Sequence, residues 1–381
     1  MRIAVVTETY PPEINGVALT VQNFVEQFAA LGHEVLLTRP RQLAADAPLL
    51  PRGVREQLVR GANLPRYPGL RFGLPSGAEL RRFWSDHAPE AVYVATEGPL
   101  GWSAVAAASA LGIPAATGFH TRFDDFVAHY GAGFLTPLVF AWLRRFHNRA
   151  GATLVPTREL QQFLLDKGFR HVHHLARGVD TGLFSPARRS ESLRREWGLA
   201  AGQLAVIHVG RIAAEKNLGL LARALHAIQA VRPDARCIVV GDGPALPALR
   251  AAHPQFHFAG MRRGDDLATH FASGDLFLFP SLSETFGNVT LEAMASGVAT
   301  VAFDYGAARE HLQHGRSGAA VAFGNADAFV HAAVELAVDA GLRRRCALAA
   351  LDTVQGLGQR AVAEALVRLL GDAAAPARRA A

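Results

Sequence analysis

The stretch PSLSETFGNVTLEAMASG, residues 280–297, decides the fold that the sequence predicts. It follows the short apolar run 276–279, which is typical of a buried strand, and its second half reads as a helix that ends at Gly297. A strand, a tight connection and a helix in this order form half of a βαβ unit. Where such units repeat, they build a parallel sheet covered by helices on both faces.

The same alternation extends from this stretch toward both ends of the chain. Strands are predicted at residues 2–7, 34–38, 91–95, 115–118, 153–156, 171–175, 205–209, 235–240, 255–258, 276–279 and 299–302. Helices are predicted at residues 17–31, 78–86, 103–111, 137–150, 218–230, 246–252, 265–272, 289–296 and over most of 326–370. Residues 40–76 show little periodicity and are predicted to form a loose connection. The fold class is therefore α/β.

A chain of 381 residues is too long for one hydrophobic core, since single cores stop growing at about 250 to 300 residues. We expect two doubly wound, Rossmann-like domains, residues 1–177 and 178–350. Residues 351–370 are predicted as a C-terminal helix that packs back toward the first domain, and the tail 371–381 as disordered. Doubly wound domains bind ligands at the carboxyl ends of their strands, so a cleft shared by the two domains is the expected site.

Composition excludes several classes of protein. Half of the residues are hydrophobic and 19% are charged, which excludes disordered, collagenous and coiled-coil proteins. The chain has no apolar run of about 18 residues and no signal-peptide pattern at its start, so we expect a cytoplasmic protein that does not span a membrane. The net charge of +6 favours anionic partners, and no nucleic-acid-binding motif is found, so nucleotides, phosphates or acidic lipids are expected. Cys237 and Cys346 are too few for a disulfide framework and are predicted as core residues.

Two cations follow the strand predicted at 205–209. Arg211 and Lys216 lie in VGRIAAEKN, residues 209–217, at the carboxyl end of that strand. A guanidinium can fork onto phosphate oxygens and an ammonium is a compact point charge, so the pair suits a diphosphate. The alternative is a solvated helix start in which Lys216 pairs with a nearby carboxylate. The turn GDGP, residues 241–244, is by itself weak evidence for a site.

Two glutamates lie eight positions apart in the stretch 280–297, Glu284 in the loop and Glu292 in the first turns of the helix. Carboxylates are repelled by phosphates but accept hydrogen bonds from hydroxyls, so we assign Glu292 to a ribose and Glu284 to a transferred sugar. The backbone amides between them form a helix N-terminus that can bind a diphosphate. These amides belong to Phe286, Gly287, Asn288 and Val289. The alternative makes Glu284 a surface charge and Glu292 an early helix residue favoured by the helix dipole.

Several strings together resemble the retaining family 4 glycosyltransferases, whose GT-B fold has two Rossmann-like domains facing each other across a cleft. They are TETYPPEINGV (7–17), RGVD (177–180), LFSP (183–186), VGRIAAEKNL (209–218), GDGP (241–244) and FPSLSETFGNVTLEAMASG (279–297). With FHTRFDDF (119–126) and FHNR (146–149), the chain is similar to bacterial α-mannosyltransferases that use GDP-mannose and to sulfoquinovosyl-diacylglycerol synthases. The resemblance covers nearly the whole chain. It implies an acceptor-side first domain and a second domain that binds a nucleotide sugar.

The resemblance also implies a role for each candidate residue. It places Gly16 near the acceptor and diphosphate, His120 against the transferred sugar, Arg211 and Lys216 on the diphosphate, Glu284 on the sugar, Glu292 on the ribose, and Arg262 near the base. Taken alone, a histidine such as His120 after a strand is more often a structural residue. One departure is Asn15-Gly16, where many members of the family have two adjacent glycines.

The implied reaction is transfer with retention on one face of the sugar, without a metal cofactor. The departing diphosphate oxygen accepts the acceptor's proton while Arg211, Lys216 and the helix N-terminus stabilise its charge. No carboxylate is assigned as a covalent nucleophile, so double displacement is not supported. Asp124-Asp125 resembles a metal-binding pair, but a solvated loop is the prediction. The expected donor is GDP-mannose; the alternatives are a UDP-sugar that donates a glucosyl, uronosyl or sulfoquinovosyl group and, in another class, a GT-B sugar-nucleotide epimerase.

The expected acceptor is a glycolipid or a lipid-linked sugar, with diacylglycerol or a soluble glycan as alternatives. Residues 134–149 mix aromatic residues with arginines, as an interfacial helix does, although a core-packed amphipathic helix has the same pattern. Peripheral contact with an anionic membrane is further favoured by basic residues in the same domain. These are Arg52, Arg55, Arg60, Arg66, Arg71, Arg81 and Arg82.

Overall fold

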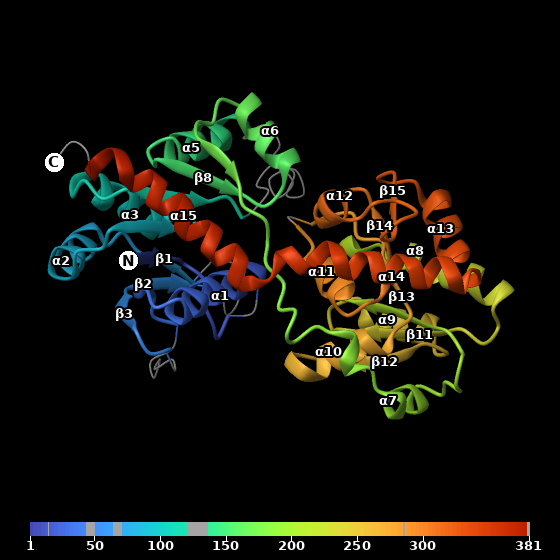
Figure 1. The fold of residues 1–381 in the computed structure, drawn as a ribbon. Helices are drawn as coiled ribbons and strands as arrows, with labels where there is room; N and C mark the ends of the chain where they lie inside the picture. Colours follow the sequence, from blue (N-terminus) through green and yellow to red (C-terminus); the bar gives the residue numbers. More distant parts are fainter. Residues whose placement is uncertain (14, 43–49, 64–70, 121–135, 285, 379–381) are drawn as a thin grey trace. The chain divides into compact units, whose positions relative to one another are not determined.

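The protein is described by a computed structural model that covers residues 1–13, 15–42, 50–63, 71–120, 136–284 and 286–378. The chain divides into two compact units, Met1–Arg177 with Gln359–Ala381, and Gly178–Gly358. Each unit contains one parallel sheet with helices around it (Figure 1).

The first unit contains a sheet of seven parallel strands in the order β3-β2-β1-β6-β7-β8-β9. Its strands are β1 (Arg2–Val6), β2 (Glu34–Pro40), β3 (Val54–Val59), β6 (Ala91–Val94), β7 (Ala115–Gly118), β8 (Ala152–Val155) and β9 (Val172–His174). A separate antiparallel pair is formed by β4 (Gly61–Asn63) and β5 (Arg71–Gly73). The helices of this unit are α1 (Gly16–Ala30), α2 (Gly77–His87), α3 (Pro99–Ala110), α5 (Thr136–His147), α6 (Arg158–Asp166) and α15 (Gln359–Arg378).

Strand β1 shows why the first sheet is apolar on both faces. Successive side chains of a strand point to opposite faces. Ile3 and Val5 pack in one cluster with residues of α1 and α15, whereas Ala4 and Val6 pack in another with α2 and α3. Figure 1 shows the red helix α15, the last of the chain, lying among the blue and green elements of this unit. The end of the chain therefore completes the core of the first unit.

The second unit contains a sheet of six parallel strands in the order β12-β11-β10-β13-β14-β15. Its strands are β10 (Ala205–Val209), β11 (Arg236–Val240), β12 (His257–Gly260), β13 (Leu276–Phe279), β14 (Ala299–Phe303) and β15 (Ala319–Val321). Its α-helices are α7 (Glu191–Glu196), α8 (Leu218–Val231), α9 (Leu246–Ala252), α10 (Gly264–Ser273), α11 (Asn288–Ala295), α12 (Ala307–His311), α13 (Ala326–Val338) and α14 (Ala340–Val354). Short 3₁₀ turns lie at Pro186–Arg188, Ala214–Lys216 and Gln355–Leu357.

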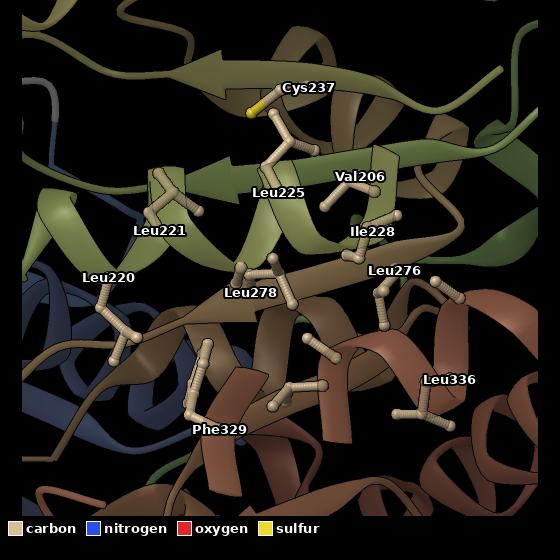
Figure 2. Packing of buried hydrophobic residues seen from close by; sticks show 14 of the residues in the cluster. Val206, Leu220, Leu221, Leu225, Ile228, Cys237, Leu276, Leu278, Phe329 and Leu336 are labelled. Atoms are coloured by element: carbon tan, nitrogen blue, oxygen red, sulfur yellow. The ribbon is translucent and has the colours of Figure 1, made fainter. Parts of the chain in front are cut away.

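The largest cluster of the second unit lies between its sheet and the helices α8 and α13. Figure 2 shows Leu221, Leu225 and Ile228 of α8 beside Val206 of β10, with Phe329 of α13 in the same cluster. The cysteines Cys237 and Cys346 are buried in this cluster and unpaired, which confirms their prediction as core residues.

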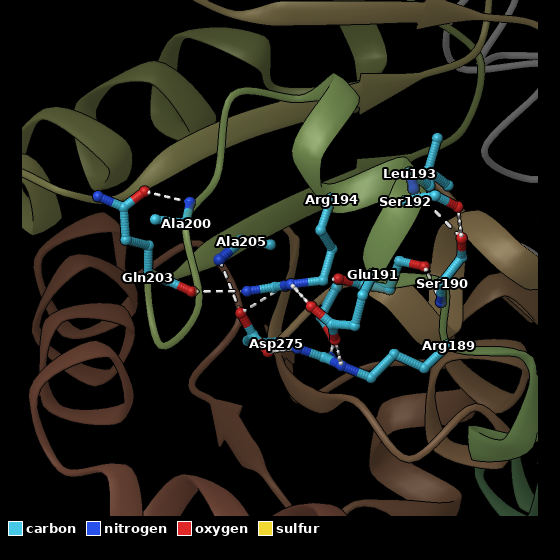
Figure 3. Close-up of polar contacts among 12 residues, drawn as sticks. Arg189, Ser190, Glu191, Ser192, Leu193, Arg194, Ala200, Gln203, Ala205 and Asp275 are labelled. Carbon is cyan, nitrogen blue, oxygen red and sulfur yellow. Dashed lines mark hydrogen bonds and ion pairs between the residues drawn. The ribbon is translucent and has the colours of Figure 1, made fainter.

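A cluster of polar side chains fixes the amino ends of β10 and β13. The carboxylate of Asp275 accepts a hydrogen bond from the Ala205 amide at 2.8 Å and pairs with Arg194 at 3.0 Å (Figure 3). The buried guanidinium of Arg194 also donates to the carbonyl oxygens of Ser273 and Gln203, each at 2.7 Å. Because Asp275 precedes β13, this network lies at the edge of the sheet away from the carboxyl ends, and we interpret it as structural.

The prediction of a loose connection over residues 40–76 was wrong in part. Residues 54–59 form β3, the edge strand of the first sheet, and β4 and β5 form a short hairpin. The sequence VREQLV has no regular alternation because an edge strand is paired on one side only and exposes charged side chains. Helix α6 was also missed, although Thr157 is a normal N-cap whose hydroxyl accepts from the Leu160 amide at 3.1 Å.

The C-terminal region also differs from the prediction. Residues 351–358 continue α14 and the following 3₁₀ turn in the second unit, and the chain enters the first unit only at Gln359. Helix α15 extends to Arg378, through most of the tail predicted as disordered, because alanine and arginine favour helix. No helix in the described part of the chain has the length and apolar character that a membrane crossing needs.

Candidate functional site

The sheet order of the second unit brings two loops together. From β10 the chain moves outward to β11 and β12, and it then returns to β13 on the other side of β10. The loops after β10 and β13 therefore leave the same edge of the sheet at its topological switch point, where doubly wound sheets bind ligands. They are in contact, since the Leu282 amide donates to the Glu215 carbonyl at 3.3 Å.

Lys216 and Glu284 form an ion pair between these two loops. The hydroxyl of Ser281 donates to the same carboxylate oxygen at 2.9 Å and lies 3.4 Å from the Lys216 ammonium. Both charged side chains are mostly buried, with exposed fractions of 13% for Lys216 and 18% for Glu284. Lys216 is therefore paired with a carboxylate, as the alternative interpretation allowed, but the partner is the other candidate residue. Glu284 is not a surface charge.

Arg211 takes a different position. Its guanidinium pairs with Glu215, four residues later, and its side chain is 65% exposed. Exposed pairs of this kind contribute little to stability, on the order of 0 to 1 kcal/mol. The structure therefore leaves Arg211 at the edge of the site, with only a weak interaction to break before it contacts a ligand.

In the turn GDGP, close packing of two backbone segments requires the glycine at position 241, which the sequence alone did not reveal. A Cβ atom at Gly241 would lie 1.9 Å from the carbonyl oxygen of Gly210, and the φ angle of Gly241 is +141°. The Gly210 amide donates to the backbone carbonyl of Val240 at 3.0 Å, and the Ile212 amide donates to the backbone carbonyl of Asp242 at 2.9 Å. The loops after β10 and β11 thus pack backbone against backbone, which fixes the segment that contains Arg211.

Helix α11 begins beside Glu284, with Gly287 as its N-cap residue. The buried Phe286 is held by its carbonyl, which accepts from the Ala307 amide at 2.7 Å. Among the described residues, no acceptor is found for the amides of Gly287 and Asn288. Free amides at a helix N-terminus are a ready anion-binding group. The neighbouring Thr285 lies outside the described residues.

Glu292 lies on α11 with Thr290 and Leu291 buried beside it. Burial raises the pKa of the half-buried Glu292 carboxyl to about 7. Within the described part of the chain, this carboxyl has no hydrogen-bond or ion-pair partner. A desolvated carboxylate without a partner is typical of a functional position, because a ligand hydroxyl can supply the missing hydrogen bond.

Arg262 is bound locally in the structure. Its Nε donates to the Ala259 carbonyl at 2.9 Å and its guanidinium pairs with Asp266 at 2.9 Å. It follows β12 at the carboxyl edge of the sheet, so its place at that edge agrees with the prediction, but its side chain does not join Lys216 and Glu284.

The loop after β1 in the first unit is held by its own side chains. Asn15 caps α1 by accepting from the amides of Val17 at 3.1 Å and Ala18 at 2.8 Å, and it donates to the Thr9 hydroxyl at 2.6 Å. That hydroxyl in turn donates to Glu13. Gly16 is exposed, and an added Cβ atom there would meet no described atom within 4 Å. The Asn15 that departs from the glycine pair of many relatives therefore has a capping function.

His120 is buried, with an exposed fraction of 8%, and both its ring nitrogens contact protein groups. Nε2 lies 2.8 Å from the hydroxyl of Tyr93, and Nδ1 accepts from Arg177 at 2.6 Å. Burial, with Arg177 next in importance, lowers the pKa of His120 well below its usual value. The sequence did not single out Tyr93 and Arg177 as partners, although both lie near the carboxyl ends of strands, as His120 does.

Two buried glutamates of the first unit were also missed. Burial raises the pKa of the Glu8 carboxyl to about 7. The amide of Leu100, which donates to this carboxyl at 2.9 Å, opposes the shift. Glu97, three residues after the end of β6, lies 3.5 Å from Nε2 of His147, whose Nδ1 is 2.7 Å from the Thr117 hydroxyl. Their signal in the sequence is an acidic residue after each strand at the switch point between β1 and β6.

No cluster of three or more histidine, cysteine or acidic side chains that could hold a metal ion is found among the described residues. Asp124 and Asp125, the acidic pair that the sequence analysis discussed, lie outside them.

Comparison with known proteins gives consistent matches over the chain. The family described as Glycosyltransferase Family 4 matches residues 14–183, and Glycosyl transferases group 1 matches residues 203–339. A GDP-mannose-dependent alpha-mannosyltransferase of Mycobacterium tuberculosis is 34% identical over 363 residues, or 93% of this chain and 92% of that protein. The sulfoquinovosyl transferase SQD2 of Arabidopsis thaliana is 31% identical over 79% of this chain and 59% of that protein. The crystal structure of Anabaena Alr3699/HepE in complex with UDP matches with a TM-score of 0.77 at 19% identity, over 98% of this chain and 100% of that chain.

Two Rossmann-like units with parallel sheets, together with this structural likeness, define a GT-B glycosyltransferase fold. The chain belongs to the family 4 glycosyltransferases, and it is a glycosyltransferase that uses a nucleotide sugar. The predictions of the family, the fold class and the enzyme class are thereby confirmed.

Proposed function

We propose that this glycosyltransferase moves α-mannose from GDP-mannose to a hydroxyl of a glycolipid or lipid-linked acceptor, with retention of configuration and without a metal cofactor. The observation that carries the proposal is the Lys216 and Glu284 pair beside the N-terminus of α11. It joins a cation suited to a diphosphate with a carboxylate suited to sugar hydroxyls. The relative whose name specifies GDP-mannose, at 34% identity, supports mannose as the sugar.

The donor would be held along the edge of the second sheet. Lys216, Arg211 and the free amides of α11 would bind the diphosphate. Glu292 would accept hydrogen bonds from the ribose hydroxyls, which supply the partner that its desolvated carboxylate lacks. Glu284 would accept from the transferred sugar, with Ser281 and Lys216 keeping its carboxylate in place.

Transfer then needs no protein nucleophile. The bond between the anomeric carbon and the diphosphate oxygen breaks, and the acceptor oxygen bonds to the same face of that carbon. The acceptor's proton passes to the departing diphosphate oxygen. Preorganised donors on the developing charge contribute about 3 kcal/mol each, on the order of a hundredfold in rate. We assign His120 of the first unit to the transferred sugar.

The second candidate donor is a UDP-sugar. The observations that favour it are the relative named sulfoquinovosyl transferase and the structural neighbour solved with UDP. A thermal-shift series with GDP, UDP, ADP and CDP separates the two, because a ligand at a hundred times its Kd stabilises by about 2.7 kcal/mol. A selective GDP shift supports the mannosyl donor, a selective UDP shift replaces it, and no shift with any nucleotide contradicts the assigned site.

Helix α5 supports a membrane-bound acceptor. It buries Leu143 and Phe146 but exposes Leu138, at 69%, and Trp142, at 44%. Arg145, three residues after Trp142 on the same helix, is also exposed. Large apolar side chains beside arginines on one helix face are typical of contact with anionic lipid. Part of this helix is therefore core-packed and part is free for an interface.

The other arginines named for this contact differ in their surroundings. Arg55 pairs with Glu34 at 3.1 Å, and Arg71 donates to the Gly61 carbonyl at 2.7 Å, so both have local partners. Arg66 lies outside the described residues. Arg81 and Arg82 are exposed on α2. The exposed face of α5 is thus the better-supported interface.

Vesicle sedimentation tests this interface. Replacing Leu138 and Trp142 together by serine should weaken binding to vesicles with phosphatidylglycerol at least about tenfold, because burying each side chain contributes about 1.5 to 3 kcal/mol. Leu348→Ser, at a leucine that is 54% exposed in the second unit, is the matched control and should bind as the unchanged protein does. No binding of the unchanged protein to these vesicles, with full activity on a soluble acceptor, would remove the membrane part of the proposal.

A further inference from the structure

The groups around His120 point to a positioning residue that lies far from it in the sequence. Tyr93 comes from β6, and Arg177 follows β9 as the last residue of the first unit. We propose that Arg177 holds His120 as a neutral imidazole with its proton on Nε2, and that Tyr93 accepts the hydrogen bond from that proton. The proposal rests on the role given to His120 in the proposed function, which it deepens.

The hydrogen-bond balance fixes the direction of each contact. A guanidinium only donates, so the 2.6 Å contact from Arg177 requires Nδ1 of His120 to accept. A neutral imidazole has one N–H group, which must then be on Nε2 and directed at the Tyr93 hydroxyl, 2.8 Å away. The tyrosine oxygen accepts this hydrogen bond and keeps its own proton for another acceptor. The result is a chain of donors that starts at Arg177 and ends at the Tyr93 hydroxyl.

The contact between the two rings depends on the absence of a side chain at position 118. Tyr93 and His120 are buried, and Gly118 lies against their contact. A Cβ atom at Gly118 would be 2.4 Å from Nε2 of His120 and 2.5 Å from the Tyr93 oxygen. Any side chain at position 118 would therefore separate the two groups.

The surrounding charges favour the neutral ring. Arg177 and His147 both oppose a second proton on His120, in addition to burial. Glu97 lies next to His147, at 3.5 Å, and no described carboxylate bonds to His120. A neutral His120 does not act as a proton donor in catalysis, so its contribution is to orient the Tyr93 hydroxyl, where the chain of donors ends. This agrees with a reaction in which the leaving diphosphate accepts the acceptor's proton.

Nitrogen NMR of the full-length protein, labelled with ¹⁵N-histidine, tests the protonation state without any substrate. The His120 signals, identified by their loss in His120→Gln, should show a protonated Nε2 and an unprotonated Nδ1 that do not change from about pH 5.5 to about pH 8.5. In Arg177→Met, which removes the donor to Nδ1, the ring should populate both tautomers, because nothing then fixes Nδ1 as the acceptor. Arg177→Lys keeps the charge and should keep the ring neutral. Arg170→Met, at an exposed arginine of the same unit, is the control and should change nothing.

Kinetics give the second readout. Arg177→Met should lower kcat about tenfold to a hundredfold, the range for a lost hydrogen bond to a charged group, and leave the KM of the donor nearly unchanged. Gly118→Ala, which separates the rings without altering Arg177, should lower kcat while Nδ1 stays unprotonated, and it keeps the test available if the Arg177 variant does not fold.

The outcomes separate the two levels of the proposal. If His120→Gln keeps full activity, the role of His120 in the proposed function is wrong, while the NMR result on its protonation can still support the action of Arg177. If His120→Gln is impaired but Arg177→Met shows the same single tautomer as the unchanged enzyme, the positioning role of Arg177 is overturned.

Discussion

Replacing Glu292 by glutamine is predicted to stabilise the second unit and to weaken nucleotide binding at the same time. Burial raises the pKa of Glu292 from 4.5 to about 7, and at 1.36 kcal/mol per unit this shift corresponds to about 3 kcal/mol. Because the folded pKa is raised, the favourable contribution is complete below about pH 4.5 and is lost as the pH rises through about 7. Above that pH the folded state holds an ionised, desolvated carboxylate that glutamine would not have.

The pH dependence of this gain is the sharpest readout. The linkage relation gives a stability difference between variant and unchanged protein that is about 2 kcal/mol larger at pH 8 than at pH 5.5. For a unit of this size, about 2 kcal/mol shifts Tm by about 4 to 8 °C. Thermal unfolding followed by circular dichroism at the two pH values measures it. Glu335→Gln, at an exposed glutamate of α13, is the control and should stay within about 0.5 kcal/mol at both.

Nucleotide binding should change in the opposite direction. If the carboxylate accepts hydrogen bonds from the ribose, its loss should raise the Kd of GDP about tenfold to a hundredfold, measured by calorimetry at pH 8. An equal Tm difference at both pH values would show that Glu292 is an ordinary solvated carboxylate. A stabilised variant with an unchanged Kd would refute the ribose contact and leave only the burial.

Three further changes test other parts of the structure. Lys216→Ala should lower kcat about a hundredfold or more in a transfer assay, because it removes a preorganised cation from the diphosphate; near-normal kcat would refute its role. Gly241→Ala should prevent normal folding, judged by soluble yield and Tm, because its Cβ atom would lie 1.9 Å from the Gly210 oxygen, whereas Gly219→Ala in α8 meets no atom and should be neutral or stabilising. Arg194→Met should lower the free energy of unfolding by about 1 to 3 kcal/mol, since it leaves the carbonyl oxygens of Ser273 and Gln203 without their donor while Arg189 still pairs with Asp275; a chemical denaturation midpoint equal to that of the unchanged protein would contradict this.

The order of strands and helices could be predicted from the sequence because most strands here are buried on both faces. The run 276–279 is apolar at every position and 299–303 is interrupted only by the buried Thr300, and Gly297 follows the helix between them. Strand β3 was not predicted because it is an edge strand, whose exposed side chains interrupt the apolar pattern. The return of the chain to the first unit at Gln359 was placed too early, because α14 and α15 are separated only by a short turn.

The residues of the candidate site also differ in how far the sequence alone indicates them. Lys216, Glu284 and Glu292 could be proposed as candidates because each lies in a distinctive string after a strand, and the sheet order brings Lys216 and Glu284 together. Their pairing with each other could not be predicted, because it depends on which strands are neighbours. Tyr93 and Arg177 were missed for the same reason, since they lie 27 and 57 positions from His120 and join it only through the order of strands in the first sheet.

The two switch points satisfy their polar groups in different ways, and this difference supports the assignment of the donor. In the first unit Glu8 accepts from the amide of Leu100, and His120 is held between two protein groups. In the second unit Glu292 has no partner among the described residues, and the amides of Gly287 and Asn288 have no described acceptor. Unpaired donors and a desolvated carboxylate are costly unless a ligand completes them, so a molecule with both phosphates and hydroxyls fits the second unit.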